Sequence, residues 1–370
     1  MALLFEQIHF GDLALQNKIV IAPMCQYSAN QQGELSFWHH QQWASYALSG
    51  AGLCIVEATA VSPEGRISYA DLGLWNDTQR DQIKALLTQI KTLSPMPFAV
   101  QLAHAGRKAS SEKPWLGRQQ IAATEPHGWQ VESASALPFH AGDAAPHALS
   151  IAEIQSVIEN FAQAAVRAVA AGFALIELHG AHGYLLHQFL SPLSNQRQDQ
   201  YGGCLENRMR LILEVFRAVQ KNLPAGFPVG VRISAQDWKV GGWTVEESIE
   251  VSKQLAQLGA AYIHVSSGGL DEQQQIEIGP NYQVPFAAAI KPHVDIPVIA
   301  VGLITEAEQA EAVLQQGQAD AIAIARALQY NPRWPWHAAA ALKTKIAIAP
   351  QYLRCQPHDV KALFQPFAEN

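Results

Sequence analysis

Eight short runs of apolar, often β-branched residues recur along the whole chain, and this recurrence constrains the fold more than any other feature of the sequence. The runs are Ile19–Pro23, Leu53–Ala60, Phe98–His104, Leu175–His179, Val229–Ser234, Tyr262–Ser266, Val298–Val301 and Ala321–Ala325. Runs of this length that are apolar at nearly every position are typical of parallel strands, which are buried on both faces. We therefore predict eight parallel strands.

Helical segments with recognisable ends lie between most of these runs. Predicted capping boxes open three of them, and a glycine closes each one. The three helices are Ile151–Ala171 (Ser150 with Glu153, then Gly172), Val245–Leu258 (Thr244 with Glu247, then Gly259) and Glu306–Gln316 (Thr305 with Glu308, then Gly317).

Strands that alternate with helices form either a closed barrel or an open, doubly wound sheet. An open nucleotide-binding sheet usually carries a glycine-rich turn after its first strand, whereas the first run here continues as Ala22-Pro23-Met24-Cys25 without a glycine. The sequence therefore predicts the α/β class and a (β/α)8 TIM barrel. A chain of 370 residues suits one such barrel with insertions, so we expect a single domain over 1–370.

Three segments do not fit the strand–helix alternation. Residues 1–18 contain Phe10-Gly11-Asp12-Leu13 between apolar positions, which predicts an N-terminal hairpin that closes the bottom of the barrel. Residues 105–149 are rich in Pro, Gly, Ser, Ala and His, and we expect this insertion after the third strand to cover the carboxyl ends of the strands. Residues 350–370 form a C-terminal tail.

Composition excludes several classes of function. A net charge of -7 and a pI near 6.0 argue against a surface that binds nucleic acid or an anionic membrane. The apolar runs are far shorter than the roughly 20 residues of a membrane span. The N-terminus lacks the basic start and apolar stretch of a signal peptide, and the four cysteines have no paired spacing. These features predict a cytoplasmic protein.

Polar side chains occur within or just after the predicted strands, whose carboxyl ends meet at one mouth in a barrel. Gln101 and Arg232 lie inside apolar runs. Because an unpaired buried guanidinium is costly, Arg232 requires either a buried anionic ligand or a structural ion pair, and both remain open at this point.

His179 and His182 follow the fourth run and have two interpretations. They are either hydrogen-bonded histidines or half of a zinc site, which would need a third protein ligand. Glu57 and Glu177, near predicted strand ends, are the available carboxylates, but they lack an obvious ligand spacing, so we expect no metal.

The ends of the last three predicted strands carry glycines and an arginine. Ser266–Gly269, Gly302 and Ala325-Arg326 lie where this fold usually binds phosphate. Tight turns alone would explain each glycine, but the arginine beside the eighth strand favours a phosphate ligand.

Several segments in order along the chain match motifs of one family. They are Ala22–Cys25, Val56–Val61, Gln101–Lys108, His179–Leu185 and Phe189–Asn195, followed by Arg197, Tyr201–Gly203 and Glu206–Arg208. With these motifs the chain resembles the Old Yellow Enzyme family of FMN-containing ene-reductases. Cys25, Tyr27 and Tyr352-Leu353-Arg354 resemble its bacterial, thermophilic-like subgroup.

The resemblance implies a site for noncovalent FMN. Pro23, Met24, Cys25, Ala58 and Gln101 would border the flavin ring, and Arg232 would lie near its N1/O2 edge. The ribityl phosphate would be lined by Ser267, Gly268, Gly302, Ala325 and Arg326. Ala325 departs from the glycine expected before the phosphate-binding arginine.

The resemblance also implies the activity. NADPH or NADH would reduce FMN and leave, and an enone or enal would then bind in its place. His179 and His182 would hydrogen-bond the carbonyl oxygen, N5 of FMN would deliver hydride to Cβ, and Tyr184 would protonate Cα. Cys25 would tune the flavin potential, and Tyr27 would line the substrate pocket.

In this subgroup the arginine that corresponds to Arg354 reaches the neighbouring subunit, so we expect a homodimer or homotetramer. The tail after Arg354 is longer than the subgroup usually carries.

Three other functions remain as alternatives. The first is a metal-assisted hydrolase that uses His179 and His182. The second is a phosphate-handling lyase with a Schiff-base lysine, for which Lys108 is the nearest candidate. The third is a flavin-binding protein without turnover, against which the presence of both histidines and Tyr184 counts.

Overall fold

The computed structural model describes residues 2–367, and its centre is a closed barrel of eight parallel strands. The strands, in their order around the barrel, are β10 (Ile263–Ser266), β11 (Val298–Ala300), β12 (Ala321–Ile324), β3 (Ile19–Ile21), β4 (Leu53–Ala60), β5 (Phe98–Ala103), β8 (Leu175–Gly180) and β9 (Val229–Ser234). All eight predicted strands are present, and the predicted (β/α)8 barrel is confirmed.

Alternation of side chains along each strand explains why the strands are apolar at almost every position. In β4, Leu53 and Ile55 belong to the cluster that fills the barrel interior, whereas Cys54 and Val56 belong to the cluster under the surrounding helices. Every residue of β4 is buried. Both faces are therefore removed from water, as expected for parallel strands.

The predicted N-terminal hairpin is present as β1 (Ile8–Phe10) and β2 (Leu13–Leu15), which pair in antiparallel register. Phe10 and Leu15 are buried in the same cluster as the barrel interior. The centroid of the Phe10 ring lies 4.7 Å from that of Tyr262, which precedes β10. The hairpin therefore closes the amino-terminal end of the barrel, as the sequence predicts.

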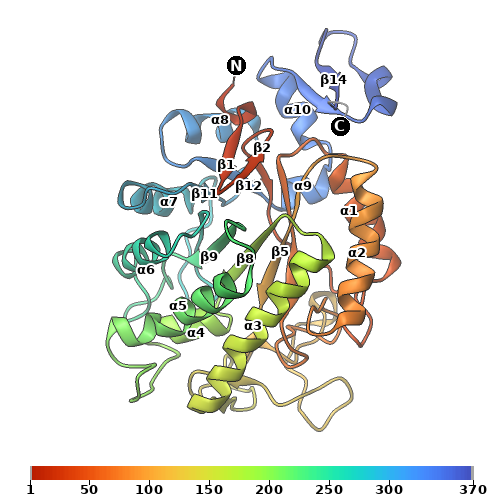
Figure 1. Cartoon of the computed structure of the whole chain (residues 1–370). Helices are drawn as coiled ribbons and strands as arrows, with labels where there is room; N and C mark the ends of the chain where they lie inside the picture. Colours follow the sequence, from red (N-terminus) through yellow and green to blue (C-terminus); the bar gives the residue numbers. More distant parts are fainter. Residues whose placement is uncertain (1, 368–370) are drawn as a thin grey trace.

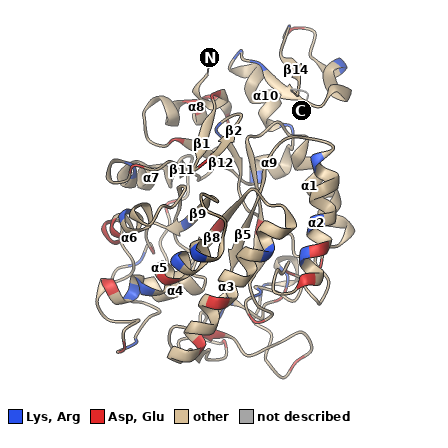
Figure 2. Ribbon diagram, viewed as in Figure 1, with Lys and Arg blue, Asp and Glu red and all other residues tan. Residues whose placement is uncertain are grey.

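Ten α-helices are described, and most of them surround the barrel (Figure 1). They are α1 (Phe37–Ala47), α2 (Asp77–Lys91), α3 (Ile151–Ala171), α4 (Leu185–Leu190), α5 (Leu205–Asn222), α6 (Val245–Gln257), α7 (Val284–Ile290), α8 (Ala307–Gln315), α9 (Arg326–Tyr330) and α10 (Trp334–Ala341). Acidic and basic side chains are interspersed on the outer helices (Figure 2). Among residues 2–367, no helix is both long and apolar enough to cross a membrane.

Two of the three predicted capping boxes are confirmed. They are the pairs Ser150 with Glu153 at α3 and Thr244 with Glu247 at α6. The third prediction is wrong: the box at α8 is formed by Glu306 with Gln309. The backbone N–H of Thr305 donates to Gln309 Oε1 at 2.9 Å, so Thr305 lies outside the helix, which begins one residue later than expected.

Residues 105–149 lie between β5 and α3 and contain little regular structure. They contain two 3-10 helices (Gly106–Lys108 and Pro114–Leu116) and the two short strands β6 (Glu132–Ser133) and β7 (His147–Ala148). In Figure 1 this segment lies at the end of the barrel opposite the N-terminal hairpin. It is therefore at the carboxyl ends of the strands, as expected.

The C-terminal part of the chain lies near the N-terminus in Figure 1. It contains the strands β13 (Ile346–Ile348) and β14 (Phe364–Pro366), which pair in parallel, and the 3-10 helix Pro350–Cys355 between them. The remaining 3-10 helices are Leu3–Phe5 and Lys291–His293.

Candidate active site

The loop that joins β8 to α4 carries three of the predicted site residues. His179 is the second-last residue of β8. The ring centroids of His182 and Tyr184 lie 5.1 and 5.0 Å from that of His179. Both contacts are edge-to-face. The structure therefore brings together the two histidines and the tyrosine that the sequence places on one loop.

Both histidines are neutral at pH 7 because their surroundings disfavour a positive charge. Burial lowers the pKa of His179 and of His182 well below the usual range, and the nearby Arg232 guanidinium lowers both further. The Ala181 N–H donates to His179 Nδ1 at 3.3 Å, so the proton of His179 is on Nε2. This Nε2–H is a hydrogen-bond donor available to a ligand.

His182 is fixed through both its backbone and its ring. Its N–H donates to Ser234 Oγ at 2.9 Å, and its Nε2 shares a hydrogen bond with Ser266 Oγ at 2.7 Å. When the Ser266 hydroxyl donates to Nε2, the ring proton lies on Nδ1 and is available as a donor.

Tyr184, Tyr27 and Cys25 all carry their protons at neutral pH. Burial raises the pKa of Tyr184, and the nearby Cys25 raises it further. Burial also raises the pKa of Tyr27 and of Cys25; for Cys25 the carboxyl groups of Asp71 and Glu57 add to the effect. Cys25 is thus a thiol, which is a poor nucleophile compared with a thiolate.

Arg232 is a buried cation whose side chain has incomplete hydrogen bonding. It lies in β9, is 7% exposed, and its Nε has no hydrogen-bond partner among residues 2–367. The nearby carboxylate of Glu177 is already engaged by Gln101 Nε2 (2.8 Å), the Tyr262 hydroxyl (3.0 Å) and His264 Nδ1 (2.9 Å). A buried guanidinium in this state fits an anionic or carbonyl-rich ligand such as the flavin ring.

Glu57 and Glu177 are not near strand ends, which corrects the expectation from the sequence. Glu57 lies in the middle of β4 at a β-bulge, accepts the Gln26 N–H at 2.8 Å and pairs with His39 at 3.2 Å. Glu177 is in the middle of β8. Among residues 2–367, no group of three or more His, Cys, Asp or Glu is placed to hold a metal ion.

A cavity of about 190 Å³ lies at the carboxyl ends of β10, β11 and β12. It is lined by His182, Arg232, Gly302, Ala325 and Arg326, among others. Gly302 has φ of 135°, and a Cβ there would lie 3.0 Å from the side chain of Gln283, so this position requires glycine. The exposed Arg326 side chain fits a phosphate at the mouth of this cavity.

Ser267 and Gly268 do not line this cavity. The Ser267 hydroxyl donates to Gln283 Oε1 at 2.7 Å, and the Gly268 N–H donates to the Gln236 carbonyl at 2.8 Å. Gln283 precedes α7 and was missed by the sequence analysis, because a glutamine in a loop gives no pattern that indicates function.

A larger cavity of about 870 Å³ is lined by Tyr184 of the His182–Tyr184 loop. Tyr27, Ile67 and Tyr184 line it, and the insertion supplies Lys108, Phe139 and much of the wall. The centroids of Tyr27 and Trp115 lie 6.0 Å apart in an edge-to-face contact. This cavity has the size and the mixed polarity of a small-molecule site.

Pro23, Met24 and Cys25 follow β3 without belonging to it, because the strand ends at Ile21. Ala58 is buried in β4, directly after the bulge at Glu57. Gln101 lies on β5, so these residues lie on or directly after β3, β4 and β5, which are neighbours in the barrel.

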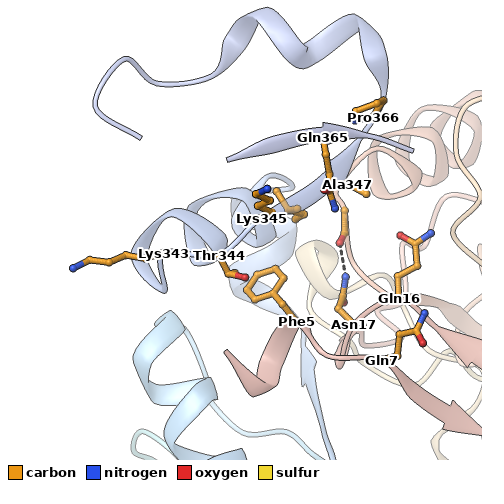
Figure 3. Close-up of a pocket in the computed structure, with 12 residues that line it drawn as sticks. Phe5, Gln7, Gln16, Asn17, Lys343, Thr344, Lys345, Ala347, Gln365 and Pro366 are labelled. Atoms are coloured by element: carbon orange, nitrogen blue, oxygen red, sulfur yellow. Dashed lines mark hydrogen bonds between the residues drawn. The ribbon is translucent and has the colours of Figure 1, made fainter. Parts of the chain in front are cut away.

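Arg354 is exposed and belongs to the 3-10 helix of the C-terminal tail. It lines neither of the two cavities beside the His182–Tyr184 loop. A separate cavity of about 870 Å³ lies between the N-terminal segment and the tail (Figure 3), and it contains none of the predicted site residues.

Comparisons with known proteins identify the family of this chain. Residues 3–345 match the model of the NADH:flavin oxidoreductase / NADH oxidase family. The chain is 44% identical over 352 residues to an NADPH dehydrogenase of Bacillus licheniformis, covering 95% of this chain and 98% of the relative.

The structure is also similar to solved structures of morphinone reductase. One has a TM-score of 0.76 at 27% identity and covers 98% of this chain and 93% of the other. A second, in complex with tetrahydroNAD, has a TM-score of 0.75 at 26% identity and covers 99% of both chains. The hydrolase and lyase alternatives are therefore set aside. The chain belongs to the NADH:flavin oxidoreductase / NADH oxidase family and is an NAD(P)H-dependent flavin oxidoreductase with FMN as its cofactor.

Proposed function

We propose that the enzyme reduces the activated C=C bond of α,β-unsaturated carbonyl compounds in a ping-pong cycle. The observation that carries this proposal is the pair of neutral histidines, His179 and His182, beside a protonated Tyr184. Such a reduction needs two hydrogen-bond donors for the carbonyl oxygen and one acid that protonates Cα, and these three side chains can supply them.

The histidines would bind the substrate carbonyl. His179 Nε2–H and His182 Nδ1–H donate to the carbonyl oxygen and stabilise the negative charge that develops on it. Neutral imidazoles suit this task because their protons stay in place at neutral pH. The Ser266 hydroxyl supports this role in the arrangement in which it donates to His182 Nε2, because the ring proton is then on Nδ1.

The cofactor residues would be Pro23, Met24, Cys25, Ala58, Gln101 and Arg232 around the flavin ring, with Gly302, Ala325 and Arg326 at the phosphate. Ser267 and Gly268, in the loop directly after β10, remain proposed neighbours of the ribityl phosphate. When bound, FMN takes up hydride from NADPH or NADH and supplies it to the substrate Cβ.

Tyr184 would complete the reaction by giving its proton to Cα. The tyrosine is protonated at neutral pH and lines the 870 Å³ cavity, where Tyr27 faces the same space. The nicotinamide and the enone would occupy this cavity in turn, which is the basis of the ping-pong order.

We propose that Arg354 completes the site of a neighbouring subunit in a homodimer or homotetramer. Support comes from its exposure and from the fact that it lines neither of the two cavities beside the His182–Tyr184 loop. We also propose a cytoplasmic location, in keeping with the free thiols of Cys25, Cys54, Cys204 and Cys355.

The direct test is anaerobic mixing of the NADPH-reduced enzyme with 2-cyclohexen-1-one. We expect reoxidation of the flavin and formation of cyclohexanone, with deuterium from labelled nicotinamide at Cβ and solvent deuterium at Cα. Cyclohexanone itself is the control and should leave the flavin reduced. Failure of several enones and enals to reoxidise the flavin, while dioxygen does so, would refute the proposed substrate class.

A further inference from the structure

The loop that carries the proposed catalytic groups has an unusual backbone. His182 has φ of 59° and Gly183 has φ of 72°, so two consecutive residues are left-handed. A non-glycine residue in this region is strained and needs support from its surroundings. The loop also has little room: a Cβ on Gly183 would lie 2.2 Å from the Gly269 carbonyl oxygen.

Three side chains from two parts of the fold, the segment after β5 and α4, hold the polar backbone atoms of this loop. Lys108 Nζ donates to the His182 carbonyl at 2.9 Å, and Gln188 Nε2 donates to the Gly183 carbonyl at 2.7 Å. The Gly183 N–H donates to His187 Nδ1 at 2.9 Å. Of these partners, the imidazole alone can change from acceptor to donor by moving its proton.

His187 is paired on its other side with a buried carboxylate. Its Nε2 lies 2.9 Å from Asp237 Oδ1, and both side chains are fully buried. Asp237 Oδ2 accepts from the Ser191 hydroxyl at 2.5 Å and from the Trp243 N–H at 2.7 Å. Because His187 Nδ1 accepts the Gly183 N–H, the ring proton is on Nε2, which faces Asp237 Oδ1.

We propose that Asp237 and His187 are positioning residues that set the loop carrying His182 and Tyr184. Asp237 fixes the His187 tautomer whose Nδ1 can accept the Gly183 N–H, and this bond holds the left-handed loop in place. With the proton on Nδ1 instead, two N–H groups would face each other across 2.9 Å. This inference rests on the proposed roles of His182 and Tyr184.

The variant Asp237→Asn tests the tautomer directly. The Trp243 N–H is a fixed donor, so the new amide places its oxygen there and turns its NH2 toward His187 Nε2. His187 must then accept at Nε2 and carry its proton on Nδ1, which opposes the Gly183 N–H. We expect the 15N resonances of His187 in the FMN-loaded enzyme to exchange their protonated and unprotonated signatures.

The kinetic consequence should appear mainly in one half-reaction. Oxidation of the reduced enzyme by 2-cyclohexen-1-one should slow by about 10- to 100-fold, the usual effect of removing a group that orients a reactive one. Reduction by NADPH should change by less than about 3-fold, because it needs no proton from Tyr184. His187→Gln, which keeps one acceptor and one donor, should retain more activity than His187→Leu.

Glu311→Gln is the matched control. Glu311 is also a buried carboxylate that accepts two backbone N–H groups, from Leu3 and Leu4, but it lies at the opposite end of the barrel. We expect Glu311→Gln to lower Tm by about as much as Asp237→Asn does and to leave the rates of both half-reactions unchanged.

Two results would overturn the inference. One is a protonated Nδ1 on His187 in the wild-type enzyme, which needs no variant to fold. The other is equal slowing of both half-reactions, or of neither, in Asp237→Asn with normal FMN content. The NMR measurement is independent of turnover, so it separates a failure of this inference from a failure of the proposed substrate class.

Discussion

His179 on β8 lies in register beside Arg232 on β9, so a neutral imidazole and a buried guanidinium share the mouth of the barrel. Burial lowers the pKa of His179, and the positive charge of Arg232 lowers it further. The imidazole therefore serves as a neutral donor, while the positive charge stays available for a ligand. The neighbouring carboxylate of Glu177 is held by other groups and does not fully satisfy Arg232.

This arrangement predicts that Arg232→Ala weakens FMN binding. The change removes a charge-assisted interaction worth about 1.5–3 kcal/mol, so Kd should rise by roughly 10- to 150-fold. Arg326→Ala should also raise the Kd for FMN, because it removes the proposed contact with the FMN phosphate. Fluorescence titration of the apoprotein measures both constants, and Arg217→Ala on the exposed face of α5 is the control. Unchanged Kd in both site variants would contradict the assignment of the flavin site.

Tyr184→Phe should separate the two half-reactions. The phenyl ring keeps the packing against His179 but has no proton to give to Cα. Oxidation of the reduced enzyme by an enone should slow by roughly 100-fold or more, whereas reduction by NADPH should stay nearly intact. Stopped-flow absorbance of the flavin measures each half separately. Equal slowing of both halves would indicate a structural role for the tyrosine.

Lys108 should control how the rate of flavin oxidation by an enone changes with pH. Its Nζ lies 5.2 Å from the centroid of the Tyr184 ring. Burial lowers the pKa of Lys108 to about 7, and Arg107 and Arg118 lower it further. The ammonium is thus present below about pH 7 and is lost as the pH rises, and while present it favours proton loss from Tyr184.

We therefore expect oxidation by an enone to slow by roughly 10-fold between pH 6 and pH 8, the scale of one charge at this separation. Lys108→Met should flatten this profile, and a profile with the same slope in the variant would exclude the lysine as its cause.

Cys25→Ala should shift the flavin reduction potential and leave activity measurable. The pKa of the thiol is raised by burial and by Asp71 and Glu57, so the residue is a poor nucleophile and a neutral neighbour of the cofactor. Equilibrium reduction against a reference dye measures the potential. Complete loss of reduction by NADPH in an FMN-loaded variant would instead indicate an essential nucleophile.

Arg354→Glu should change substrate or nicotinamide kinetics without emptying the flavin site. The side chain is exposed in its own chain, so an effect on KM of roughly 10-fold requires a neighbouring subunit. Kinetics and sedimentation should be measured on the same preparation. Wild-type kinetics in an oligomeric variant would reject a site shared between subunits.

Much of the fold follows from the sequence because the determining forces are local or apply to whole strands. Parallel strands buried on both faces must be apolar at nearly every position, so β4 and β9 have the bounds that their composition predicts. A capping box lies within four residues of chain, so the start of α3 is equally readable. At α8 two overlapping pairs competed, and the sequence pattern alone favoured the wrong one.

Motif resemblance supplied the residues that we propose surround the cofactor and substrate, because such residues act through their own chemistry and are recognisable in the sequence. The sequence analysis placed the carboxylates of Glu57 and Glu177 near strand ends, and this was wrong because their positions depend on contacts with other parts of the chain. Glu57 and Glu177 lie in the middle of strands, where Glu57 accepts a hydrogen bond from the Gln26 N–H and Glu177 accepts hydrogen bonds from Gln101, Tyr262 and His264. No spacing in the sequence encodes these contacts.

The sequence by itself determined the barrel, its hairpin and insertion, and the identity of the groups that can carry the reaction. The tertiary structure alone decided the protonation states of these groups and the contacts that hold them in place. Neutral imidazoles at His179 and His182 result from burial and from a guanidinium on another strand. The tautomer of His187 depends on the Gly183 N–H at Nδ1 and on Asp237 at Nε2, 50 residues further along the chain, because the groups that face the two ring nitrogens decide where the proton lies.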